Sequence, residues 1–289
     1  MIGVTGGTGF IGSHLVKALH EAGFSVRLLT HHHLPMQVEG IEYVQGNLDD
    51  PVTLKRFSTG CNTIIHLVGI IRESKDQTWE HIHVQGTRNL VQTAQQTGVR
   101  QFIYNSAIGA SKNAEVGYMR TKAHAEAIIQ ASGIPYTIFR PSFVAGPEDK
   151  SINFFADLIR ILPIVPIIDA GVKFQPVFID DLVKCIRESI CHPHMQNKIF
   201  DVGGPNQLTM HEIYETIARV LEKRRVWLTL HPRQMRLAAQ IMQHLPGAPL
   251  TPSQLTMLEM DGRCNVEPIK EALGISFTPF ESALRAYLS

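Results

Sequence analysis

Cysteine is scarce in this chain of 289 residues, which contains only four cysteines. No two of them form a Cys-x-x-Cys pair, and none has a metal-type spacing to a histidine. The three consecutive histidines at positions 31–33 do not change this, because adjacent side chains point in different directions and are poorly placed to share an ion. The sequence therefore predicts no metal site and the reduced cysteines of an intracellular protein.

The chain also lacks long apolar runs and an excess of charge of one sign. No apolar run reaches the roughly 20 residues of a membrane span, and residues 1–4 read as a first strand rather than as a signal peptide. The formal net charge is +1, and the densest basic cluster, at residues 223–225, is typical of a solvated helix end. We therefore expect a cytoplasmic protein with no transmembrane segment and no nucleic-acid partner. Peripheral contact with a membrane or a protein complex stays open.

Strand-like and helix-like segments alternate through the first half of the chain. Glycines at positions 23, 98 and 133 stop the helical segments, as expected of helix C-caps. Such alternation with short connections predicts an α/β fold, a Rossmann-type doubly wound parallel sheet. The expected strands are residues 2–5, 25–30, 41–45, 62–68, 101–105 and 136–140, and the expected helices are residues 10–22, 79–97 and 118–132.

Prolines become frequent after Pro141 and divide the remaining chain into short pieces. This change predicts a Rossmann domain over residues 1–145 and a small C-terminal lobe on the substrate side over residues 146–289. A strand at 198–202 is expected to return to the main sheet, so residues of about 180–203 rejoin the first domain.

A glycine-rich loop, Thr5–Gly12, lies between the first strand and the first helix. Gly6 permits a tight turn, Gly9 lets the backbone approach a pyrophosphate, and Gly12 lets the helix pack on the strand. The helix N-terminus then offers free N–H groups to the phosphates. Because the loop opens a series of βα units, it predicts a site for NAD or NADP.

The end of the second strand lacks the acid that would bind the ribose 2′-hydroxyl of NAD. Thr30 is followed by histidines, and Arg27 lies within the strand and not at its end. We hypothesise that His31 or His32, when protonated, meets the 2′-phosphate of NADP. NADP is therefore the favoured cofactor, with NAD as the alternative.

Tyr118 and Lys122 are four residues apart, so they share one face of a helix. A nearby ammonium group is expected to lower the pKa of the Tyr118 phenol and make it an acid–base group. Ser106 ends the fifth strand, at the sheet edge where such folds bind ligands, and its hydroxyl is predicted to orient a substrate carbonyl. The alternative is a surface tyrosine–lysine pair, with Ser106 capping a helix.

These motifs together resemble the short-chain dehydrogenase/reductase superfamily, in its extended or atypical branch. The nearer resemblance is to the NAD-dependent epimerase/dehydratase-like group that includes the nucleotide-binding accessory subunit of respiratory complex I. The resemblance is carried by Thr5–Gly12, by residues 67–69, 83–86, 106, 118–122 and 140–149, and by residues 174–181 and 250–254. It implies that further residues border the cofactor, namely Thr8, Phe10, Ile11, Asn47, Leu48, Leu67, Val68, Gly69 and Pro141.

The sequence leaves three functions open. The first is an oxidoreductase that transfers hydride between nicotinamide and a small carbonyl or alcohol substrate of unknown identity, using Ser106, Tyr118 and Lys122. The second, which the resemblance implies, is an NADP-holding protein without turnover that acts in the structure or assembly of a respiratory or similar complex. The third is a sugar epimerase, which His83 disfavours because that family usually has asparagine there.

Overall fold

The computed structural model describes residues 1–31, 38–242 and 251–288, which form two compact units. Unit 1 comprises the described residues of 1–141, 182–201 and 267–275. Unit 2 comprises the described residues of 142–181, 202–266 and 276–289. In the described residues, no helix is long and apolar enough to cross a membrane.

Unit 1 is built on a seven-stranded sheet with the order β11-β6-β5-β4-β1-β2-β3. All neighbouring pairs from β3 to β6 are parallel, which confirms the predicted doubly wound α/β fold. The chain order reverses between β1 and β4, and ligands bind at such a reversal in open parallel sheets. The strands are β1 (Ile2–Thr5), β2 (Val26–Thr30), β3 (Ile41–Gln45), β4 (Thr63–His66), β5 (Gln101–Asn105), β6 (Tyr136–Pro141) and β11 (Lys198–Val202).

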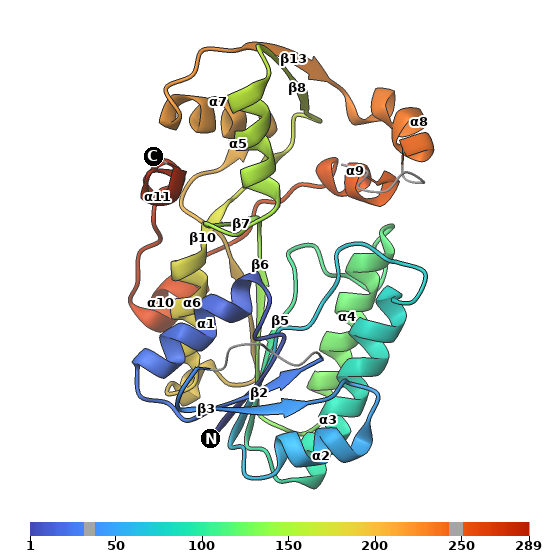
Figure 1. The fold of residues 1–289 in the computed structure, drawn as a ribbon, viewed down its shortest axis with the longest axis vertical. Coiled ribbons are helices and arrows are strands. Elements are labelled where there is room, and N and C mark those ends of the chain that lie inside the picture. Colours follow the sequence, from blue (N-terminus) through green and yellow to red (C-terminus); the bar gives the residue numbers. More distant parts are fainter. Residues whose placement is uncertain (32–37, 243–250, 289) are drawn as a thin grey trace. The chain divides into compact units, whose positions relative to one another are not determined.

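Helices cover both faces of this sheet, with α1 and α6 on one face and α2, α3 and α4 on the other (Figure 1). The aromatic residues Phe57, Phe102 and Tyr104 are fully buried between the sheet and the α2–α4 layer. The helices are α1 (Phe10–Glu21), α2 (Pro51–Ser58), the π-helix η1 (Glu80–Gln85), α3 (Gly86–Gln96), α4 (Gly117–Gln130), α6 (Ile179–Ser189), the 3₁₀ helix η2 (Pro193–Met195) and α10 (Glu267–Leu273).

The long helix expected at residues 79–97 is divided into η1 and α3. Gly86 stands at the junction, where a Cβ atom would lie 2.7 Å from Cδ1 of Leu48. The glycine therefore lets the helix approach the loop after β3. π-helical turns are rare and often occur at functional sites, and η1 contains His83, which is discussed below.

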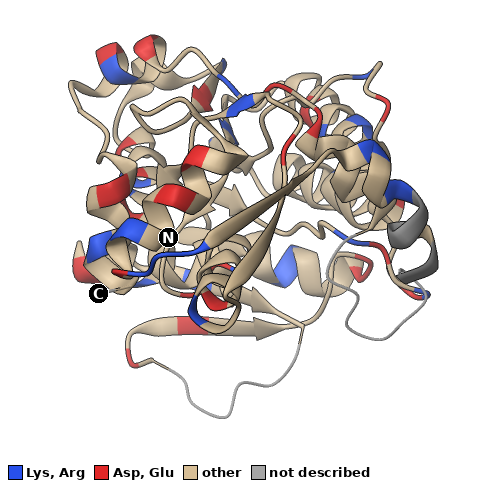
Figure 2. Ribbon diagram, turned by 90° about the horizontal axis from the view of Figure 1, so that it is seen from above, with Lys and Arg blue, Asp and Glu red and all other residues tan. Residues whose placement is uncertain are grey.

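Unit 2 has its own core, in which α5, α7 and α11 pack together with one side of a two-stranded parallel sheet of β8 and β13. Charged residues of both signs are interspersed over the whole ribbon (Figure 2). The elements are β7 (Val144–Ala145), α5 (Ser151–Ile161), β8 (Ile164–Ile168), β9 (Lys173–Phe174), β10 (Val177–Phe178), β12 (Leu208–Thr209), α7 (Met210–Val220), β13 (Val226–Leu230), α8 (Pro232–Met242), α9 (Pro252–Leu258) and α11 (Phe280–Leu288).

Candidate functional site

The glycine loop connects β1 to α1 and is shaped by close backbone packing. Gly6 has a φ of +73°, and the N–H of Gly9 donates to its carbonyl oxygen at 3.1 Å. A Cβ atom on Gly12 would lie 2.1 Å from that same oxygen, so only glycine fits there. A Cβ atom on Gly9 would approach nothing closer than 3.4 Å. The loop is therefore closed at its base and open in front of Gly9.

The N-terminus of α1 faces this open space without a side-chain cap, and its first turn contains no acidic residue. Thr8 and Gly9 are exposed, and Phe10 and Ile11 are half-buried. Uncapped N–H groups and the positive end of the helix dipole attract a diphosphate. The loop therefore fits a dinucleotide.

The loop after β4 connects the glycine loop to the acid–base candidates. A Cβ atom on Gly6 would lie 2.9 Å from the backbone of Leu67 and Val68, so the two loops touch. A Cβ atom on Gly69 would lie 3.2 Å from Nζ of Lys122 and 3.4 Å from Nε2 of His83. The structure thus brings Gly69 to Lys122 and His83, while the cofactor contacts of residues 67–69 stay a prediction.

Tyr118 and Lys122 both lie on α4, one turn apart. Nζ of Lys122 donates to the carbonyl oxygen of Asn105 at 2.9 Å and lies 4.8 Å from the centroid of the Tyr104 ring. Burial lowers the pKa of Lys122 to about 7, while the carboxylate of Glu126 acts to raise it. At neutral pH this amine is therefore close to half protonated.

The pKa of Tyr118 differs from the sequence-based expectation. Burial raises it to about 12, and Lys122 does not lower it. The reason is burial, which disfavours the charged phenolate, while Nζ of Lys122 is directed to the carbonyl oxygen of Asn105. The prediction of a depressed phenol pKa is wrong, and Tyr118 is protonated at neutral pH.

His83 is a residue of this site that the sequence did not mark as functional. Its Nε2 atom accepts a hydrogen bond from the N–H of Ile70 at 3.1 Å, so Nδ1 carries the proton and donates to Oγ1 of Thr121 at 2.9 Å. The ring meets the Tyr118 ring edge-on, with centroids 5.5 Å apart. His83 therefore connects the loop after β4 to the helix that carries Tyr118.

Trp79 is a second residue that the sequence did not indicate. Its ring lies edge-on to Tyr118 at a centroid distance of 6.4 Å and contacts Gly117, where a Cβ atom would come within 2.9 Å of the indole. Tyr118 thus contacts aromatic rings from Trp79 and His83. A wide sequence separation hides this contact, because no local pattern connects residues 79 and 118.

Ser106 lies at the end of β5, but its hydroxyl group donates to the carboxylate of Glu126 at 2.5 Å. Glu126 is buried and forms a two-pronged ion pair with Arg140, in which Nε of Arg140 donates at 2.8 Å. The hydroxyl hydrogen that would bind a substrate carbonyl is therefore directed into the protein. The substrate-orienting role of Ser106 stays a prediction, and the structure gives this residue a different partner.

Replacing Ser106 by alanine separates the two roles. Loss of a buried hydrogen bond to a charged group is expected to lower the free energy of unfolding by about 1–3 kcal/mol. If the chain turns over NADPH, the rate is expected to stay within about threefold of the parent, because Tyr118 and Lys122 are untouched. A fall of two orders of magnitude in turnover at unchanged stability would instead assign Ser106 to catalysis.

The remaining predicted cofactor residues lie near the ends of the sheet strands. His31 is exposed directly after β2, whereas His32 lies outside the described residues. Asn47 is exposed, and its side-chain oxygen accepts from the N–H of Asp49 at 2.8 Å. Leu48 is buried in the core and Pro141 is buried at the end of β6, so their cofactor contacts stay a prediction.

Two buried histidines make the stability of unit 1 sensitive to acid. Burial lowers the pKa of both His66 and His83 to about 3, from about 6.5 in an unfolded chain. Between these values the unfolded chain binds a proton that the folded chain does not, so stability falls as the pH falls. From pH 7 to pH 5 each ring is expected to remove about 2 kcal/mol from the free energy of unfolding.

Urea unfolding of the parent and of His66→Asn at pH 7 and pH 5 tests this expectation. The variant should lose about 2 kcal/mol less between the two pH values than the parent does. His124→Gln, on the exposed side of α4, is the control and should keep the parent's dependence. An unchanged difference in His66→Asn would mean that the buried ring is not neutral.

The fold and the glycine loop define a dinucleotide-binding protein of the Rossmann type. The model of the NAD(P)H-binding family matches residues 6–156, which is more than half of the chain, and the chain belongs to this family.

Named relatives confirm the nearer resemblance as well. The chain is 27% identical over 224 residues to the mouse protein named NADH dehydrogenase [ubiquinone] 1 alpha subcomplex subunit 9, covering 74% of this chain and 59% of the relative. It is 28% identical over 185 residues to a protein named ceramide reductase from Caulobacter vibrioides, covering 63% of this chain and 58% of the relative. The chain thus spans about three-fifths of the length of these relatives.

Solved structures agree on the fold. An NADPH-dependent quinone oxidoreductase from Escherichia coli, solved with NADPH, has a TM-score of 0.81 at 16% identity and covers 100% of both chains. A Thermus thermophilus UDP-glucose 4-epimerase, solved with NAD, has a TM-score of 0.73 at 19% identity and covers 98% of this chain and 96% of the other. NADPH and NAD both occur in this fold, so the chain is described as NAD(P)-binding.

The relatives correct the prediction about partners. The sequence-based prediction names a small-molecule substrate of unknown identity and leaves contact with a protein complex open. The mouse and Arabidopsis relatives are named as subunits of NADH dehydrogenase, and a Neurospora crassa relative is named as a subunit of an NADH-ubiquinone oxidoreductase. These relatives are therefore members of protein complexes by name. The partner prediction is wrong because it puts a small molecule, and not other proteins, first.

Proposed function

We propose that this chain is an NAD(P)H-dependent oxidoreductase of the short-chain dehydrogenase/reductase type that reduces a carbonyl substrate. The observation that carries the proposal is the cluster of Gly69, His83, Tyr118 and Lys122 beside the glycine loop. Lys122 and His83 meet Gly69 in the loop after β4, and that same loop touches the glycine loop at Gly6.

The cofactor would be held by the open backbone at Gly9, the N-terminus of α1 and the loop at Leu67–Gly69. When bound, NAD(P)H supplies a hydride to the substrate carbon. Lys122 is buried against Asn105 and Gly69, and its Nζ atom would hold a ribose hydroxyl of the cofactor.

Tyr118 would donate the proton that the carbonyl oxygen needs. With a pKa of about 12 the phenol is almost wholly protonated at neutral pH, so the donor form is present and the acceptor form is rare. The protonated phenol is the form that a carbonyl reduction needs. His83 and Trp79 hold the ring edge-on, which limits the directions in which the hydroxyl group points.

We propose NADP as the preferred cofactor, because the described residues after β2 begin with His31 and include no acid before Glu39. Replacing His31 by glutamine is expected to weaken NADPH binding several-fold and to leave NADH binding unchanged. Fluorescence titration with both dinucleotides measures this. Equal losses of affinity for NADPH and NADH would mean that His31 does not recognise the 2′-phosphate.

The cytoplasmic location stays a prediction.

A second function is favoured by a different observation. The hydroxyl of Ser106 is bound to Glu126, and several relatives are named as subunits of large assemblies. Both fit a protein that binds its dinucleotide tightly and acts in an assembly without turnover.

A turnover assay with matched variants separates the two functions. The purified chain is incubated with NADPH and a panel of aldehydes, ketones and quinones, and loss of NADPH absorbance is followed. The proposal expects turnover with at least one carbonyl class, retained in Tyr136→Phe, a half-buried control at the opposite end of the sheet. Absence of turnover with every class, together with bound dinucleotide that survives purification, would favour the assembly protein.

A further inference from the structure

Among the described residues of unit 2, the sheet of β8 and β13 has an apolar face that no other element covers. The parallel register pairs Ile164 with Val226, Pro166 with Leu228, and Ile168 with Leu230, so these side chains share one face. Ile164 is 56% exposed, Val226 is 63% exposed and Leu228 is 51% exposed.

The opposite face contributes Val165 and Ile167 to the core, where both are fully buried. Parallel strands are normally covered on both faces. In this sheet, one side is covered and the other displays a row of aliphatic side chains. Contiguous exposed apolar surface of this kind marks a contact with a partner or a membrane.

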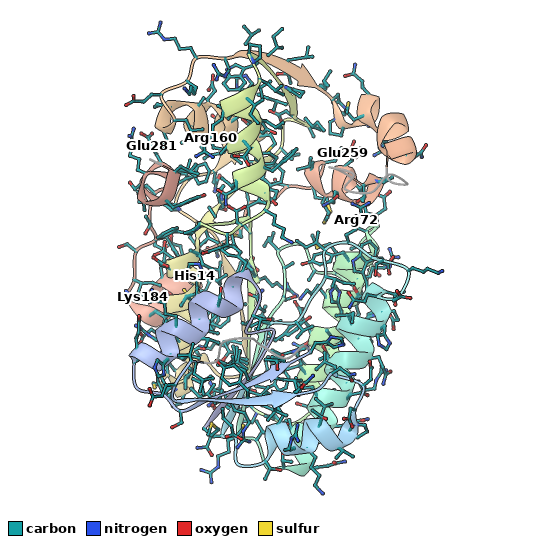
Figure 3. The ribbon with its side chains drawn as sticks, in the orientation of Figure 1. His14, Arg72, Arg160, Lys184, Glu259 and Glu281 are labelled. Carbon is teal, nitrogen blue, oxygen red and sulfur yellow. The ribbon has the colours of Figure 1, made fainter. Side chains whose placement is uncertain are left out.

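Cations gather at one end of the same face. Because β8 and β13 run parallel, the segments that precede them lie at the same end of the sheet (Figure 1). α5 ends there with Arg160, labelled in Figure 3, and with Ile161, which is 75% exposed. The segment before β13 brings Lys223 and Arg224, which are both exposed.

Arg225 fixes this arrangement, because Nε donates to the carbonyl oxygen of Ile159 at 2.6 Å and Nη2 donates to that of Arg160 at 3.2 Å. It thereby caps the C-terminus of α5 and joins it to the start of β13. The acids at this end are Asp157, which pairs with Arg160, and Glu222. This end of the sheet therefore carries a net positive charge. It has four basic residues and two acidic ones, namely Arg160, Lys223, Arg224 and Arg225 against Asp157 and Glu222.

We propose that this face of unit 2, formed by the outer side chains of β8 and β13 with Ile161 and the basic residues at its end, docks on the surface of an anionic phospholipid membrane. Aliphatic side chains enter the boundary between headgroups and acyl chains, while Lys223 and Arg224 meet lipid phosphates. A lipid surface is favoured by charge complementarity, because exposed Lys223 and Arg224 stand at the end of an aliphatic face, and anionic membranes attract this combination. Trp227 points to the covered side.

Vesicle co-sedimentation with the 289-residue chain tests the proposal. The chain should bind vesicles of phosphatidylcholine mixed with phosphatidylglycerol, and it should bind vesicles of phosphatidylcholine alone far more weakly. Raising the salt concentration should weaken binding to the anionic vesicles, since the lipid surface potential is screened. No binding to anionic vesicles, or equal binding to both kinds, would overturn the proposal.

Two variants locate the contact. Lys223→Gln with Arg224→Gln should weaken binding to anionic vesicles about 25-fold, roughly fivefold for each charge. Ile161→Glu should reduce binding below detection, because it places a carboxylate against anionic lipid. Val52→Glu is the matched control, since Val52 on α2 in unit 1 is 79% exposed, and it should bind as the parent does.

All variants change exposed side chains, so their unfolding midpoints should equal that of the parent, which excludes misfolding as the cause. If Ile161→Glu binds vesicles as the parent does but abolishes self-association seen by sedimentation velocity, the face is a protein interface and the membrane proposal is wrong.

Discussion

Replacing Tyr118 by phenylalanine is expected to lower carbonyl reduction by two to four orders of magnitude, the usual contribution of a positioned proton donor. The change removes one oxygen atom and leaves the ring contacts with Trp79 and His83 in place. NADPH affinity should stay within about twofold, because no contact with the glycine loop is altered. Steady-state rates at saturating NADPH, together with fluorescence titration, measure both quantities.

Tyr136→Phe is the control for this experiment. Its hydroxyl accepts from Nε2 of Gln130 at 3.3 Å at the far end of β6, and its loss should leave the rate unchanged. If Tyr118→Phe turns over as fast as the parent does, the phenol is not the proton donor.

Replacing Gly12 by alanine is expected to abolish detectable NADPH binding and to lower the free energy of unfolding by about 3 kcal/mol. The added Cβ atom would lie 2.1 Å from the carbonyl oxygen of Gly6 and 2.6 Å from Cα of Gly7. Both neighbours are backbone atoms, so the glycine loop itself must move. Urea unfolding and dinucleotide titration measure the two effects.

Gly23→Ala is the matched control at the other end of α1. Gly23 has a φ of +78° and open space within 4 Å of its Cβ position, so the cost is confined to backbone strain of about 1 kcal/mol. Its NADPH affinity should equal that of the parent. Equal loss of affinity in both glycine variants would mean that binding reports general stability and not the shape of the loop.

Much of unit 1 could be predicted from the sequence, because its signals are local. The expected strands at residues 2–5, 41–45 and 101–105 agree with β1, β3 and β5. β1 and β5 are short buried runs, as expected of parallel strands inside a sheet, whereas β3 is an edge strand with mainly exposed or half-buried residues. The helix α2 was not predicted, although Asp50 caps it through the N–H of Val52 and Pro51 occupies its first turn. An aspartate followed directly by a proline is a sequence signal for the start of this helix.

The chemistry of the site was harder to predict, because it depends on contacts between distant segments. The sequence places Tyr118 and Lys122 on one helix face, but it does not reveal that Lys122 is buried against Asn105 or that Ser106 donates to Glu126. The pKa of a phenol follows from burial and from where its neighbours point, and neither is a local property. His83 illustrates the same limit, since its partners Ile70 and Thr121 lie on two other segments.

The exchange rate of bound dinucleotide tests the account's central claim most directly. The purified chain is loaded with NADPH, excess NADP⁺ is added, and the loss of NADPH fluorescence is followed with time. A reductase must release its cofactor in every catalytic cycle, so the account predicts exchange within seconds at an open loop around Gly9. Retention of NADPH for hours would contradict a reductase and would assign the dinucleotide to the stability of the fold.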